Sequence, residues 1–199
     1  MNTHKLIDRC GSPIRHRIRL LPLVVVASLL SVFAARHLLS KEPSQIPQKA
    51  PELTQIDHWI NSDGLKLADQ KGKVVVLHFW TFDCINCQHN LPYYNKWQTD
   101  FAKDGVQIIG VHTPETSFEA DPKNVATQVK KRDIKYAVAV DTDGATWKAY
   151  ENRFWPSIYL IDKQGRIRYR WEGELEYKNA GGDKTLRAQI RALLAESAK

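Results

Sequence analysis

Cysteine is scarce in this chain, and its scarcity excludes several kinds of protein. There are three cysteines among 199 residues, at positions 10, 84 and 87. A small domain held together by disulfides needs more cysteines at wider separations. A structural zinc site needs four ligands, and the nearby His89 would fall on a different helix face from Cys87. Gln88 stands where a c-type haem attachment motif requires histidine.

Excess positive charge is absent from most of the chain. The formal net charge is +7, but the first 41 residues hold seven lysines or arginines and one aspartate, giving +6, and the rest carries +1. Nucleic-acid binding needs a concentration of basic residues that the larger part lacks, so no nucleic-acid partner is expected. The basic residues flank a hydrophobic segment instead, which is typical of targeting sequences.

Long uncharged hydrophobic runs are also few, and residues 20–35 form the one with basic flanks. This run is slightly short of the ~20 residues that span a bilayer and slightly long for a cleaved signal. Ala34 and Ala35 make a poor cleavage site, and Leu38 and Leu39 extend the run, so residues 20–39 are predicted to be a membrane anchor. A cleaved signal is the alternative. The excess of lysine and arginine before the run predicts that residues 1–19 stay in the cytoplasm and the rest is exported.

A proline-rich segment follows the hydrophobic run. Residues 40–51 contain Pro43, Pro47 and Pro51 and no apolar periodicity. This composition predicts an extended tether of roughly 35 Å. The remaining residues, 52–199, are enough for one domain with a proper hydrophobic core.

Hydrophobic periodicity divides this domain into strands and helices. Near-continuous apolar runs predict strands that are buried on both faces, and apolar residues spaced by three or four predict helices. The predicted strands are residues 74–79, 106–112, 136–140, 157–161 and 166–171, and the predicted helices are residues 85–103, 122–132, 145–150 and 184–196. Strand–helix–strand units followed by a hairpin and a closing helix predict an α/β fold, with a central mixed sheet flanked by helices.

The cysteines after the tether form a Cys-Ile-Asn-Cys motif behind the first predicted strand. If a helix begins at Cys84, its unpaired N–H groups and its dipole stabilise the Cys84 thiolate. Cys87 lies one turn later on the same face and can close a disulfide with it. An accessible, acidified thiol that attacks and a more buried thiol that resolves are what thiol–disulfide exchange requires. The motif therefore predicts a redox-active pair that needs no separate cofactor.

The residues around the motif resemble a known family. The segments concerned are FWTFDCINCQ at 79–88, NLPY at 90–93, GVHTPE at 110–115 and RFWP at 153–156. Together they are similar to the membrane-associated thioredoxin-like proteins of the TlpA and DipZ type, over about residues 73–174. This resemblance implies a thioredoxin fold with an extra βα unit, roughly residues 123–150, before a cis-proline at Pro156.

The same resemblance implies a function and a location. It implies a thiol-disulfide oxidoreductase at a bacterial inner membrane, with its thioredoxin-like domain in the periplasm. Cys84 is then the nucleophile and Cys87 the resolving thiol. The expected partners are client proteins, whose disulfides are reduced, and a membrane electron donor. An oxidising or isomerising role remains open, because the residues between the cysteines carry no charge that sets the reduction potential.

Candidates for client binding and proton transfer lie near the motif. Pro156 has no N–H, so the backbone of Trp155 is open to an extended client strand, and the rings of Trp155 and Phe82 suit polypeptide binding. Thioredoxin carries a buried acid at the place occupied here by His78. His78 and Glu115 are therefore candidates for proton transfer, although a core histidine and a solvated carboxylate are the simpler interpretations.

Two other functions remain open. Thr81-Phe82-Asp83-Cys84 matches the Thr-x-x-Cys pattern of peroxiredoxins, in which threonine orients a peroxide at a reactive cysteine. Leu77, however, stands where that pattern has proline. The second alternative is a thioredoxin-fold binding module without enzymatic activity, which would need neither cysteine.

Overall fold

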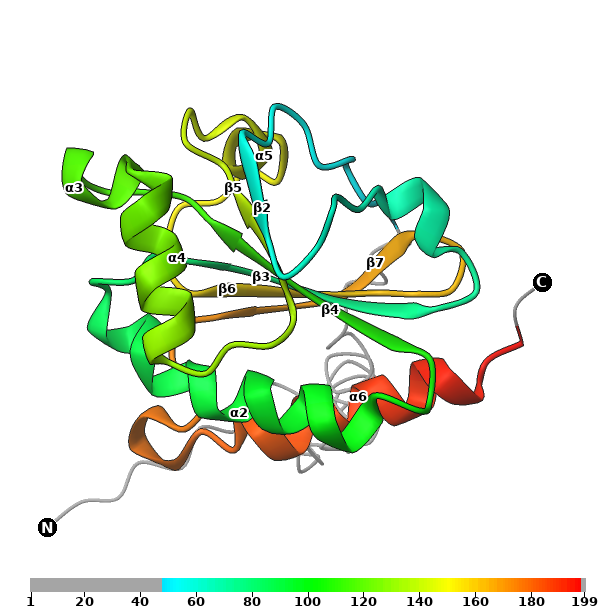
Figure 1. Cartoon of the computed structure of the whole chain (residues 1–199). Helices are drawn as coiled ribbons and strands as arrows, with labels where there is room; N and C mark the ends of the chain where they lie inside the picture. Colours follow the sequence, from blue (N-terminus) through cyan, green and yellow to red (C-terminus); the bar gives the residue numbers. More distant parts are fainter. Residues whose placement is uncertain (1–47, 198–199) are drawn as a thin grey trace, which may run out of the picture. The chain divides into compact units, whose positions relative to one another are not determined.

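Strand β3 (Val74–Trp80) forms the centre of the fold, and all seven of its residues are buried. The computed structural model describes residues 48–197, in which β3 belongs to a seven-stranded mixed sheet (Figure 1). Its parallel neighbour is β4 (Val106–His112), and its antiparallel neighbour is β6 (Ser157–Ile161). A strand with neighbours on both sides and side chains packed over both faces is shielded from water, which explains its almost wholly apolar sequence.

Four more strands complete the sheet in the order β1-β7-β6-β3-β4-β5-β2. They are β1 (Gln48–Lys49), β2 (His58–Ile60), β5 (Ala137–Val140) and β7 (Arg166–Glu172). Strands β3, β4 and β5 run parallel to one another. Their carboxyl ends therefore meet at one end of the sheet, and the loops that follow them converge there.

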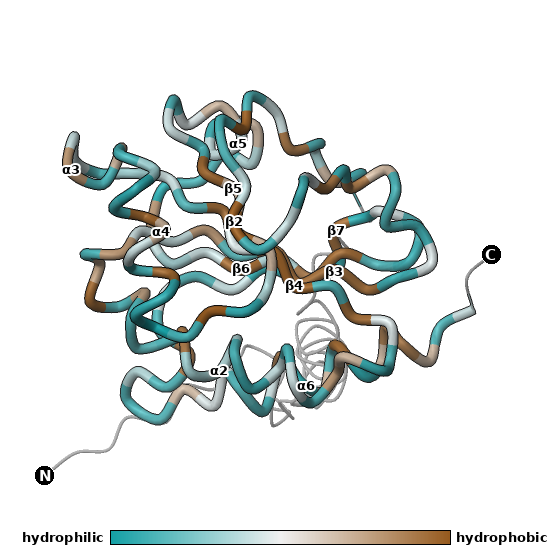
Figure 2. Tube along the Cα trace, in the orientation of Figure 1, coloured by the Kyte–Doolittle hydropathy of each residue, from teal (hydrophilic) through white to brown (hydrophobic). Residues whose placement is uncertain are grey.

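The helices enclose two hydrophobic cores, one on each face of the sheet. They are the α-helices α2 (Ile85–Phe101), α3 (Ser117–Ala120), α4 (Pro122–Lys131), α5 (Ala145–Ala149) and α6 (Gly182–Ala195), and the 3-10 helices η1 (Leu67–Gln70) and η2 (Tyr177–Asn179). Alternate residues of β3 supply the two cores: Val76 packs with side chains of α2, α4 and α6, whereas Leu77 packs with Leu67 and Tyr150. Figure 2 shows this concentration of hydrophobic residues on the central strands.

The fold class predicted from the sequence is confirmed. All five predicted strands and all four predicted helices are present, and their ends differ from the predictions by at most two residues. The extra unit before Pro156 is present as α4, β5 and α5, and the peptide bond between Trp155 and Pro156 is cis. Elements that the sequence analysis did not predict are β1, β2, α3 and the two 3-10 helices.

The folded part begins earlier than the predicted start at residue 52. Gln48 and Lys49 pair with β7, and Ala50 is buried, so the last residues of the predicted tether belong to the sheet. A strand of two residues has no periodicity that can be recognised, and the prolines dominate the local pattern. The rest of the tether, the anchor at 20–39 and the basic segment 1–19 lie outside the described residues. Within residues 48–197, no helix is long and apolar enough to cross a membrane.

Candidate active site

The Cys-Ile-Asn-Cys motif lies where β3 ends and α2 begins. Cys84 is the N-cap of α2, with an extended backbone conformation, and Cys87 lies in the first turn. The backbone N–H of Cys87 donates a hydrogen bond to the Cys84 Sγ over 3.3 Å. The start of α2 thus directs a backbone donor at the Cys84 sulfur, as the sequence predicts.

The two sulfurs have different surroundings. Both are free thiols, but Cys84 is half-buried and Cys87 is fully buried. Hydrogen bonds from the side chain and the N–H of Cys87 lower the pKa of Cys84 to about 7, although burial and the Glu115 carboxylate oppose this effect. Burial and the adjacent Cys84 sulfur raise the pKa of Cys87 far above its ordinary value. Near neutral pH a thiolate is therefore accessible at Cys84, while Cys87 keeps its proton.

The loop that contains the cis-proline lies at the same end of β3 as the cysteines, because Ser157, the residue after Pro156, pairs with Phe79. Trp155 is half-exposed and, like Cys84, packs against the core between the sheet and α2. Its indole stacks on Trp147 with ring centroids 4.0 Å apart. Pro156 is buried, and its carbonyl accepts a hydrogen bond from the N–H of Gly173. Just before it, Phe154 is 59% exposed.

Phe82 does not lie on the surface, in contrast to the predicted role in client binding. Its ring is fully buried, stacks on His112 and meets Phe118 edge to face at 5.8 Å. Phe118 belongs to α3, which the sequence analysis missed, and is 59% exposed. The capping-box pattern from Thr116 to Glu119 is the signal that identifies this short helix.

The two candidates for proton transfer lie in opposite environments. His78 is fully buried, its ring stacks on Tyr94 at 4.0 Å, and neither ring nitrogen has a hydrogen-bond partner. Burial lowers the pKa of His78 to about 3, so its imidazole is neutral near pH 7. Glu115 is exposed, and its charge raises the pKa of both thiols. Of the two, Glu115 is the group whose charge acts on the sulfurs.

A buried carboxylate that the sequence analysis missed lies beside the loop before the first cysteine. Glu119 is 1% exposed. One of its oxygens accepts hydrogen bonds from the Thr81 hydroxyl and the Asp83 N–H, and the other accepts from the N–H groups of Glu115 and Thr116. Burial alone would raise the pKa of Glu119, but these donors lower it below its usual value. Glu119 is therefore ionised, and the Thr81 hydroxyl is engaged by it.

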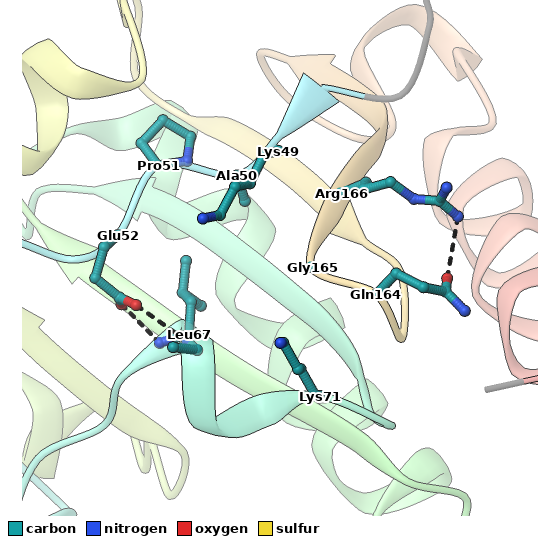
Figure 3. Close-up of a pocket in the computed structure, with 10 residues that line it drawn as sticks. Lys49, Ala50, Pro51, Glu52, Leu67, Lys71, Gln164, Gly165 and Arg166 are labelled. Carbon is teal, nitrogen blue, oxygen red and sulfur yellow. Dashed lines mark hydrogen bonds between the residues drawn. The ribbon is translucent and has the colours of Figure 1, made fainter. Parts of the chain in front are cut away.

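A pocket of about 590 Å³ lies at the opposite end of β3 (Figure 3). Its walls come from β1, η1 and the turn between β6 and β7, and they include Lys49, Glu52, Lys71 and Gly165. Inside it, the Glu52 carboxylate accepts hydrogen bonds from the N–H groups of Leu67 and Ala68. Because η1 precedes β3 and Cys84 follows it, this pocket is not part of the cysteine site.

Comparisons with known proteins agree with this geometry. Residues 46–170 match the AhpC/TSA family. The chain is 44% identical over 131 residues to the protein DipZ of Mycobacterium bovis, which covers 64% of this chain and 19% of DipZ. It is 32% identical over 138 residues to the thiol-disulfide oxidoreductase ResA of Bacillus thuringiensis, which covers 69% of this chain and 76% of ResA.

A solved structure shares both the fold and part of the sequence. The thioredoxin-like superfamily protein SPOA0173 matches with a TM-score of 0.68 and 36% identity, over 76% of this chain and 99% of that protein. The chain spans only about a fifth of DipZ, so the likeness to DipZ concerns that part of it alone. From the family match, the fold and the paired cysteines, the chain belongs to the AhpC/TSA family and is similar to the thioredoxin-like thiol-disulfide oxidoreductases of the TlpA and DipZ type.

Proposed function

We propose that this chain is a membrane-tethered, extracytoplasmic enzyme that reduces disulfides in client proteins with Cys84 and Cys87. The observation that carries the proposal is the asymmetry of the two thiols. The half-buried Cys84 has a pKa of about 7, and the buried Cys87 has a strongly raised pKa. Thiol–disulfide exchange needs these two states, because an ionised thiol attacks the client disulfide and a protonated thiol waits to resolve the mixed disulfide.

The proposed reaction has two exchange steps. In the first, the Cys84 thiolate attacks one sulfur of a client disulfide, forms a mixed disulfide and releases the other client sulfur as a thiolate. In the second, Cys87 loses its proton and attacks the Cys84 Sγ, which forms the Cys84–Cys87 disulfide and releases the second client thiolate. The client gains two electrons and the dithiol loses two, so a two-electron donor must restore the reduced pair, and we expect this donor in the membrane.

The proton of Cys87 has to leave before resolution. Glu115 is exposed and acts on both thiols through its charge, which supports a role as the acceptor that passes this proton to solvent. His78 is neutral and has free ring nitrogens, so it remains a second candidate. Its complete burial supports a role in the core instead.

Exposed apolar side chains support a polypeptide as the substrate. Ile85, Phe118 and Phe154 are each 59% exposed, and they come from the start of α2, from α3 and from the loop before Pro156. Large hydrophobic side chains exposed around one site are typical of a binding surface for protein segments. We expect an extended client strand to pair with the backbone of Trp155 and place its disulfide over Cys84.

The alternative of a peroxidase finds no support in the position of Thr81. Its side chain is fully buried and donates its hydroxyl hydrogen to Glu119, so it does not point into an open peroxide site. A binding module without activity would not need the difference between the two thiols. The proposed reaction uses the dithiol alone, with no further cofactor.

Reduction and trapping experiments test the proposal together. The reduced full-length chain should reduce a protein disulfide, and Cys84→Ser should abolish this activity. Cys87→Ser should retain mixed disulfides on Cys84, because the resolving step is lost. Cys10→Ser is the matched control and should behave as wild type. If the wild-type chain reduces no protein disulfide and Cys87→Ser captures no thiol-linked protein, the proposal is refuted.

A further inference from the structure

The loop between β3 and Cys84 is held by side chains from much later in the chain. Its residues, 81–83, lie outside any strand or helix. The N–H of Phe82 donates to His112 Nε2 over 3.3 Å, and the N–H of Asp83 donates to Glu119 Oε1 over 3.1 Å. These partners are 30 and 36 residues away in the sequence.

In the same loop, the Phe82 carbonyl is held by a side chain at the end of α4. The Phe82 carbonyl accepts a hydrogen bond from Arg132 Nη2 over 3.0 Å and a second one from Gln88 Nε2 over 2.8 Å. Arg132 is in turn tied to α2, because its own carbonyl accepts a hydrogen bond from the Asn95 side chain. Glu119 and Arg132 therefore hold the loop from both ends of the α3–α4 segment, one as an acceptor and the other as a donor.

A loop without ladder hydrogen bonds depends on such side-chain contacts for a fixed shape. Residues 81–83 set the direction in which Cys84 enters α2, and hence whether its Sγ stays over the N–H of Cys87. Neither Glu119 nor Arg132 needs to touch a substrate to affect this geometry. Glu119 also accepts from the N–H of Glu115, so it fixes the backbone that carries the exposed carboxylate near the sulfurs.

We propose that Glu119 and Arg132 are positioning residues that clamp the loop 81–83 and thereby keep the Cys84 sulfur in reach of the first-turn donors of α2. The inference deepens the proposed exchange reaction at Cys84 and rests on it. It assigns to the α3–α4 segment a role in the reactivity of the nucleophile.

The packed elements place charged groups around Cys84 and the loop before it, and of these Glu115 acts on the sulfur itself. Glu115 and Glu119 lie on the α3 side, Asp83 precedes Cys84, and Arg132 approaches from α4. His112, beneath the loop, is neutral at pH 7 because burial lowers its pKa to about 4. A change of Cys84 reactivity in a variant of Glu119 or Arg132 therefore has to be compared with the effect of removing a charge elsewhere on the surface.

The test measures alkylation of Cys84 by iodoacetamide as a function of pH in the reduced full-length chain, with the modified residue identified by fragment mass spectrometry. In Glu119→Gln, one side-chain oxygen becomes an NH₂ group, which leaves at least the Asp83 N–H or the Glu115 and Thr116 N–H groups without an acceptor. Arg132→Met keeps the apolar stem and removes the donors. Arg132→Lys retains the positive charge and a donor, and should restore most of the wild-type behaviour.

Both disruptive variants should lower the alkylation rate at pH 6 by about threefold or more, because less of Cys84 is then thiolate, and rates near pH 9.5 should agree within about twofold. Lys131→Met and Glu151→Gln remove the same charges at exposed positions and should leave the profile unchanged. Profiles of Glu119→Gln and Arg132→Met that superimpose on wild type, or equal shifts in the control variants, would overturn the inference.

A measurement on the wild-type chain covers the case in which a variant does not fold. The amide hydrogens of Phe82 and Asp83 should exchange with solvent as slowly as those of β3, although they belong to no strand or helix. Rapid exchange at both amides contradicts the clamp. Alkylation and hydrogen exchange need no client, so failure of the clamp is distinguishable from failure of the proposed reductase activity.

Discussion

The backbone N–H of Cys87 donates to the Sγ of Cys84 over 3.3 Å, so the residue proposed to resolve the reaction also stabilises the thiolate proposed to start it. The same residue supplies a side-chain hydrogen bond, which is the largest influence that lowers the pKa of Cys84 to about 7. Once Cys84 enters a mixed disulfide, its negative charge is gone and the hydrogen bond from the Cys87 thiol weakens. Loss of that bond leaves the Cys87 thiol available to lose its proton.

Removing the Cys87 thiol should make Cys84 less acidic. In Cys87→Ala the backbone N–H remains, but the side-chain donor is lost, so we expect the pKa of Cys84 to rise by about half a unit to one unit. Thiolate absorbance near 240 nm as a function of pH, in a Cys10→Ser background, measures this shift. Asn86→Ala in the same background changes an exposed side chain of the motif and should leave the absorbance midpoint near its starting value. An unchanged midpoint in Cys87→Ala would show that the thiol contributes nothing.

Acidification should destabilise the fold through its buried histidines. The pKa of His78 falls from 6.5 in the unfolded chain to about 3 in the fold, so stability is complete above pH 6.5 and is lost as the pH falls towards 3. His78 alone should then cost roughly 2 kcal/mol of unfolding free energy between pH 7 and pH 5. Denaturant titrations at pH 7 and pH 5 measure the unfolding free energy at each pH. In His78→Leu, the difference between the two values should be smaller than in wild type by about 2 kcal/mol.

The contribution of His78 can be separated from those of other histidines. His112 is also buried with a pKa lowered to about 4, so part of the acid sensitivity should persist in His78→Leu. His58 is exposed, and His58→Gln should retain the wild-type dependence on pH. If His78→Leu loses as much stability as wild type between pH 7 and pH 5, the buried imidazole is not the cause.

Phe118 should matter for protein substrates and not for small ones. Its exposed ring packs edge to face on Phe82, close to Cys84 along the chain. We expect Phe118→Ser to lower kcat/KM for a protein disulfide by about three- to tenfold, since an exposed aromatic anchor is worth on the order of 1 kcal/mol. Reduction of glutathione disulfide by the same variant should be unchanged, and an equal loss for both substrates would assign Phe118 a structural role.

Hydrogen peroxide should oxidise Cys84 slowly. Because the Thr81 hydroxyl is buried and bound to Glu119, no hydroxyl of the Thr-x-x-Cys pattern is free to orient peroxide. Stopped-flow measurements should therefore give a rate similar to that of a free low-pKa thiol, and Thr81→Val should not reduce that rate by more than about twofold. A fast reaction that depends on Thr81 would instead favour the peroxidase.

The strongly patterned parts of the chain could be predicted from the sequence. Strand β3 is a nearly continuous apolar run, and α2 has an apolar stripe from Cys87 to Phe101, so both elements can be recognised from their local sequence. The placement of Cys84 and Cys87 at the start of α2 could be predicted from the same patterns. The roles of Phe82 and Glu119 could not be predicted, because they depend on how α3 packs against the loop after β3. Strands β1 and β2 are too short for a pattern and exist through their partners β7 and β5.

Within the described residues, 48–197, strand β7 pairs with β1 at Ile167 and Arg166. Beyond that contact, its exposed positions are Arg168, Arg170 and Glu172, of which Arg170 and Glu172 form an ion pair. A foreign strand that joined the sheet at this margin would have to strip water from these three charged groups, a known safeguard against aggregation. If the chain acts on client proteins as proposed, these charges favour contact at its cysteine end and disfavour the addition of a client strand along β7.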